Sequence, residues 1–123
     1  MGTAVVVLAD PAGGDDAAGR VFNALAATSD LRHSGEDVTM IFQGAGTRWA
    51  ALLADPEHPF HELFVTVRPA VAGVSEACST FFGARDAAVD AGFALVTGNP
   101  VEGAGELPSM ARFVADGDRI LTF

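Results

Sequence analysis

The sequence predicts an α/β fold, a three-layer α/β/α arrangement around a mainly parallel sheet of about five strands. Short apolar runs of strand length alternate along the chain with longer stretches of helical spacing, which is the pattern of βαβ units. The first run, residues 4–9, is apolar throughout, as in a strand buried on both faces of a parallel sheet. With 123 residues, the chain is expected to form one domain, residues 1–123.

Apolar spacing and Gly, Pro and Asp boundaries predict the individual elements. In chain order they are a strand at 4–9, a turn at 10–16, a helix at 16–32, a strand at 37–43, a helix at 47–54, a short helix or lid segment at 60–66, a strand at 71–77, a helix at 81–91, a strand at 93–97, a loop at 98–106, a helix at 107–116 and a closing strand at 119–123. Right-handed crossovers between successive strands then give a parallel sheet.

Composition and charge exclude several classes of partner. Sixteen acidic residues against seven arginines and no lysine give a net charge of −9, so we expect neither a nucleic acid nor a membrane surface as a partner. A hydrophobic fraction of 50% without any run of membrane-spanning length predicts a subunit interface, hence a homo-oligomer. A lone cysteine and a strand that begins by residue 4, leaving no room for a signal peptide, predict a cytoplasmic location.

Cys78, the only cysteine, is the first candidate for chemistry. We expect it at the carboxyl end of the strand at 71–77, with Ser79 and Thr80 as N-cap oxygens of the following helix. A thiolate is favoured beside a helix N-terminus, where unpaired N–H groups face it. The alternative is a buried, inert cysteine that serves as a small core residue.

Open parallel sheets bind ligands outside the carboxyl ends of their strands. Three predicted loops meet that description, at residues 10–15, 43–47 and 77–80. We therefore expect a crevice in which catalytic Cys78 faces a set of binding residues, namely Asp10, Gln43, Gly44, Ser79 and Thr80.

Two other cysteine chemistries can be compared with the sequence. A phosphatase loop needs an arginine after five intervening residues, whereas six separate Cys78 from Arg85, so this chemistry does not fit. A Cys–His pair through His58 or His61 stays an alternative, but both histidines lie in a proline-flanked hinge, where solvated side chains are expected. The histidines and the cysteine lack zinc-site spacing, so no metal and no cofactor are expected.

The strand–Cys78–helix unit resembles the unit that holds the sulfur-carrying cysteine in DsrE/DsrF-like proteins of the sulfur relay. Residues 4–8 with the helix from Asp15, the strand and turn at 34–46 and the helix–strand at 113–123 resemble that family's other elements in order. The resemblance implies a DsrE/F-like fold and a sulfurtransferase-like role for Cys78 as a persulfide carrier. It also implies sulfur donor and acceptor proteins as partners, and a trimer or hexamer.

A second hypothesis assumes the same fold without sulfur chemistry at Cys78. In that case the protein is a non-catalytic, homo-oligomeric binding or scaffold protein with a structural cysteine. The solvent accessibility of the Cys78 sulfur distinguishes the two hypotheses.

Overall fold

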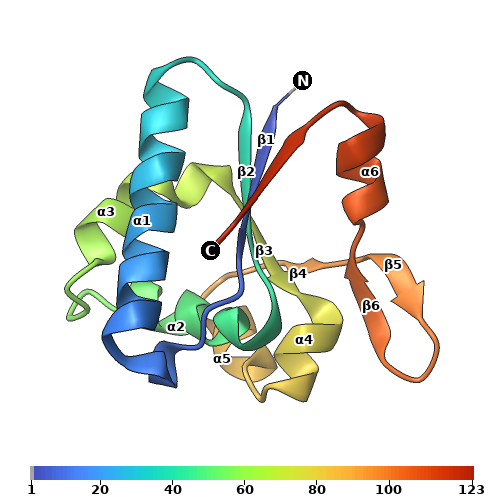
Figure 1. Ribbon diagram of the computed structural model, residues 1–123. Coiled ribbons are helices and arrows are strands. Elements are labelled where there is room, and N and C mark those ends of the chain that lie inside the picture. The colour runs from blue at the N-terminus through green and yellow to red at the C-terminus, as the bar shows by residue number, and fades with distance from the viewer. Residues whose placement is uncertain (1) are drawn as a thin grey trace.

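A computed structural model describes residues 2–123 (Figure 1). The elements in chain order are β1 (Thr3–Val7), η1 (Pro11–Gly13), α1 (Gly14–His33), β2 (Val38–Phe42), η2 (Gly44–Arg48), α2 (Trp49–Ala54), α3 (His61–Val67), η3 (Arg68–Ala70), β3 (Val71–Ser75), α4 (Glu76–Phe81), α5 (Arg85–Asp90), β4 (Leu95–Val96), β5 (Gly98–Val101), β6 (Gly105–Pro108), α6 (Met110–Ala115) and β7 (Arg119–Thr122), where η denotes a short 3-10 helix.

Five strands form one parallel sheet in the order β4-β3-β2-β1-β7. The central strand pairs are in simple register, with Ala4 of β1 beside Thr39 of β2 and Ile120 of β7. All five residues of β1 are buried, as expected for a strand in the middle of a covered parallel sheet. The predicted α/β class and the parallel sheet are therefore confirmed.

The strand order decides which face each helix covers. From β1 to β4 every step runs in the same direction along the sheet, and right-handed crossovers then keep the connecting helices on one face. The last step returns past β1 to β7, which places α6 on the opposite face. Figure 1 shows this arrangement, with α1 and α3 on one side of the sheet and α6 with the β5–β6 hairpin on the other.

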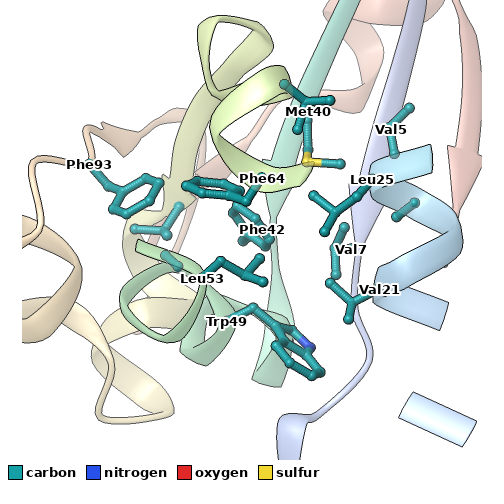
Figure 2. Close-up of a cluster of buried hydrophobic side chains, with 14 of the residues drawn as sticks. Val5, Val7, Val21, Leu25, Met40, Phe42, Trp49, Leu53, Phe64 and Phe93 are labelled. Carbon is teal, nitrogen blue, oxygen red and sulfur yellow. The ribbon is translucent and has the colours of Figure 1, made fainter. Parts of the chain in front are cut away.

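The main core lies between the sheet and the first group of helices (Figure 2). Phe42 of β2, Phe64 of α3 and Phe93 pack against one another, with ring centroids 5.9–6.5 Å apart. Val21 and Leu25 of α1 point toward Val5 and Val7 of β1, and all of these side chains are fully buried (Figure 2). Apolar spacing of helical period along α1 produces this contact.

The segment around Cys78 differs from the prediction. β3 ends at Ser75, two residues earlier than expected, and α4 begins at Glu76. Of the helix expected at 81–91, only α5 at Arg85–Asp90 forms, and it is separated from α4 by a break at Gly83, which adopts a φ of +68°. Ser79 and Thr80 are consequently helical residues, and the prediction that they cap the helix is wrong.

The segment after β4 also differs. The expected loop at 98–106 forms the antiparallel β5–β6 hairpin, in which Gly98 pairs with Pro108 and Val101 with Gly105. The last helix starts at Met110 rather than at Leu107, because the Ser109 side chain accepts a hydrogen bond from the Arg112 N–H and caps it. The strand expected at 93–97 is reduced to the two residues of β4.

A close approach between β3 and the segment before β4 constrains the sheet at Gly73. The pairing of β2 with β3 shifts register at Met40 and Ile41, and Gly73 adopts a φ of +145°. A Cβ atom at Gly73 would lie 2.1 Å from the Ala94 carbonyl oxygen. This position therefore requires glycine both for its backbone conformation and for space.

We predict that Gly73→Ala lowers the free energy of unfolding by about 2 kcal/mol or more, because neither the backbone nor the Ala94 carbonyl can yield cheaply. The matched control is Gly19→Ala in α1, where nothing lies within 4 Å of an added Cβ. That substitution should stabilise the protein by about 0.5–1 kcal/mol. Urea unfolding followed by circular dichroism measures both, and a neutral Gly73→Ala would contradict the close approach.

Candidate functional site

Cys78 lies in the first turn of α4, the six-residue helix that directly follows β3. The helix begins where it does because Ser75, at the end of the strand, is fully buried and its side chain accepts a hydrogen bond from the Cys78 N–H at 3.3 Å. Cys78 is a free thiol of intermediate exposure. It is neither part of the main core cluster nor fully exposed.

α4 is held from two sides. On one side, the Glu76 carboxylate accepts a hydrogen bond from the Glu106 N–H of β6 at 3.3 Å, and Gly105 approaches Ala77 closely. On the other, α4 packs against η2, which follows β2. These contacts bury Ala77 and leave Phe81, at the end of the helix, 82% exposed. The helix therefore presents a partly covered thiol and an uncovered aromatic ring.

Arg48 connects the loops that follow the first three strands. Its guanidinium forms an ion pair with Asp10 after β1, with Nη1 3.3 Å from a carboxylate oxygen. Its Nε donates to the Phe82 carbonyl at the end of α4 at 3.1 Å, and the guanidinium lies 5.5 Å from the centre of the Phe82 ring. Parallel strands bring these three segments to the carboxyl edge of the sheet, and Arg48, a residue that the sequence analysis did not single out, links them there.

The predicted binding residues occupy different environments. The Asp10 side chain accepts from the Ala12 N–H at 3.0 Å and so caps η1. Gln43 is 8% exposed, and its backbone N–H donates to the Val7 carbonyl. Gly44 begins η2 with a φ of +57°. These residues belong to the loops that Arg48 joins.

Ser79 and Thr80 do not act as the sequence analysis expected. The Ser79 hydroxyl is buried and donates to the Glu76 carbonyl at 2.8 Å, so it is internal to α4. Thr80 is exposed, and its hydroxyl accepts from Arg85 at 3.4 Å. Within residues 2–123, no side-chain hydrogen bond joins Cys78 to any of the five predicted binding residues.

The two histidines considered as cysteine partners are engaged elsewhere. The His58 ring accepts from the Phe60 N–H at 3.0 Å and packs edge-on against Trp49. His61 Nδ1 lies 2.8 Å from the Leu53 carbonyl. Both are half-buried and anchor the segment between α2 and α3, which corrects the expectation that they are solvated.

A metal centre and a membrane span can be examined over the same residues. In the described part of the chain, residues 2–123, no group of three or more His, Cys, Asp and Glu side chains is arranged to hold a metal ion. None of the helices described there is both long and apolar enough to cross a bilayer.

Comparisons of this chain with protein-family models, with curated proteins and with solved structures found no match.

The Ser75 cap provides a local test of how Cys78 is positioned. We predict that Ser75→Ala accelerates hydrogen exchange at the Cys78 amide about fivefold, because loss of an N-cap costs about 1 kcal/mol and frays the first turn. Amide exchange measured by NMR reports this directly.

The matched control is Ser109→Ala, which removes the equivalent cap of α6, another six-residue helix. It should accelerate exchange at Arg112, whose N–H lies 3.3 Å from the Ser109 hydroxyl oxygen, and leave Cys78 unchanged. Equal protection of Cys78 in both variants would contradict the assigned cap.

Proposed function

We propose that this protein is a sulfur carrier of the DsrE/DsrF-like type that holds persulfide sulfur on Cys78. The observation that supports the proposal is the intermediate exposure of the residue Cys78 in the first turn of the helix that follows an inner parallel strand, β3. A purely structural cysteine is more often fully buried. The proposal includes a cytoplasmic location, and donor and acceptor proteins as partners.

The chemistry needs one thiolate and no cofactor. The Cys78 thiolate attacks the terminal sulfur of a donor persulfide, R–S–SH, whose S–S bond breaks as the new one forms. The products are Cys78–S–SH and the donor thiolate R–S⁻, so no external oxidant or reductant is consumed. An acceptor thiolate then removes the terminal sulfur in the same way and restores the Cys78 thiolate.

A carrier also needs surfaces on which other chains dock. Phe81 is 82% exposed and lies on the same six-residue helix as Cys78. A large aromatic side chain exposed to this extent is typical of a protein–protein contact. We therefore place the interface of a homo-oligomer, a trimer or hexamer, at Phe81.

Sulfur loading tests the carrier role. After incubation of the native protein with inorganic polysulfide, intact-mass spectrometry should show the addition of one sulfur atom, and Cys78→Ser should abolish it. Because α4 packs against β6 on one side and η2 on the other, which limits solvent access to Cys78, we expect the added sulfur to persist after the excess donor is removed.

The matched control moves the thiol to another half-buried helical position, Ala27→Cys in the Cys78→Ser background. This thiol on α1 should lose its added sulfur faster. Absence of loading at Cys78, or equal persistence at the two positions, would reject the proposal.

The interface has its own test. We expect Phe81→Ser to shift the protein toward the monomer in analytical ultracentrifugation, since it removes the most exposed of the large apolar side chains. Val65→Ser is the matched control, because Val65 is 51% exposed and belongs to α3, which Figure 1 shows well apart from α4. A monomeric wild-type protein, or equal behaviour of the two variants, would refute the interface.

A further inference from the structure

A pocket of about 340 Å³ opens beside Arg48 at the carboxyl edge of the sheet. It lies between η1, the start of α2 and the start of α5, so three separate loops contribute to it. Apolar side chains and backbone make up most of the lining, and we call it the Arg48 pocket; its residues are Asp10, Pro11, Ala12, Thr47, Arg48, Ala51, Leu52, Gly83, Ala84 and Ala87. Cys78 is not among them.

One cation and one anion lie side by side in this lining. Arg48 Nη1 is 3.3 and 3.5 Å from the two Asp10 carboxylate oxygens, and the two side chains are 43% and 40% exposed. Charge-assisted hydrogen bonds are usually shorter than this, about 2.7–2.9 Å. An exposed pair of this kind contributes little stability, so a ligand that separates the two groups loses little.

Both charged groups are oriented in advance by other contacts. The Arg48 Nε donates to the Phe82 carbonyl, and the Arg48 guanidinium lies over the Phe82 ring. The Asp10 carboxylate is fixed by the Ala12 N–H. A ligand therefore meets a positioned guanidinium and a positioned carboxylate next to an apolar cavity, which lowers the entropic cost of binding.

We infer that the Arg48 pocket binds a small zwitterion with an apolar body, the chemistry of a free hydrophobic α-amino acid. The ligand carboxylate pairs with Arg48, its ammonium with Asp10, and its side chain occupies the space beside Leu52 and Ala87. The net charge of −9 disfavours a simple anion, and Arg48 disfavours a simple cation. The volume is at the lower end of the range for ligand pockets, which matches a small ligand.

The position of the pocket agrees with the general rule for open parallel sheets. Their ligands bind outside the carboxyl ends of the strands, and the lining comes from the segments that follow β1, β2 and β3. This inference stands apart from the sulfur-carrier proposal, because neither Cys78 nor Phe81 contributes to the pocket. Either can fail without the other.

A ligand panel tests the inference on the wild-type protein. NMR titration compares L-leucine and L-phenylalanine with analogues that lack one charge, 4-methylpentanoate and 3-phenylpropanoate without the amine, and isoamylamine and phenethylamine without the carboxylate. We expect an amino acid to bind and each of its analogues to bind about threefold more weakly, since each leaves one exposed charged partner unpaired. Equal binding of an analogue, or no binding of either amino acid at millimolar concentration, would overturn the inference.

Two pairs of variants test the location. Ala87→Leu fills the pocket from α5 and should abolish binding, whereas Ala26→Leu on an exposed face of α1 should not. Arg48→Gln should weaken binding of the amino acid about threefold. Arg85→Gln is its control, because it makes the same change in charge at an exposed arginine outside the lining and should have no effect. Binding that survives Ala87→Leu would place the ligand elsewhere and refute the assignment.

Discussion

The order of the strands in the sheet constrains the rest of this structure. Because β1, β2, β3 and β4 follow one another along the sheet, their right-handed connections cover a single face. The aromatic cluster of Phe42, Phe64 and Phe93 forms there, and the opposite face is left to the β5–β6 hairpin and α6 (Figure 1). Gly73 makes this order sterically feasible where β3 meets the segment before β4.

The same order brings the functional candidates together. Because the strands are parallel, the loops that follow them all lie at one edge of the sheet, and the loops of consecutive strands lie next to one another. Arg48 connects three of these loops through Asp10 and the Phe82 carbonyl. Cys78, a residue of intermediate exposure, lies on α4, and the Arg48 pocket opens between η1, α2 and α5. Both proposed sites, the sulfur-carrying Cys78 and the pocket for a small zwitterion, therefore lie at the carboxyl edge of the sheet.

The sequence predicted what depends on local pattern. The apolar run of β1 and the helical spacing of α1 are strong local signals, and both elements were placed within about two residues, the usual uncertainty of such boundaries. The start of α4 was misplaced because Ser75, Ser79 and Thr80 are all chemically able to cap a helix. β3 ends at Ser75, whose side chain accepts from the Cys78 N–H, whereas the Ser79 hydroxyl donates to the Glu76 carbonyl inside the helix. The hairpin was missed because its glycines and proline resemble a loop. Arg48 was missed because its partners are 38 and 34 residues away in the sequence.

The sulfur-carrier proposal requires that reagents reach the Cys78 sulfur in the folded protein. The most direct measurement is the rate at which a thiol reagent labels Cys78 as a function of urea below the unfolding transition. Labelling of the native state should be rapid and nearly independent of urea, because Cys78 is a partly exposed residue and the carrier role requires its sulfur to be reachable without unfolding. A rate that rises with urea in parallel with global unfolding would mean that the sulfur is sealed in the native structure, and would contradict the account.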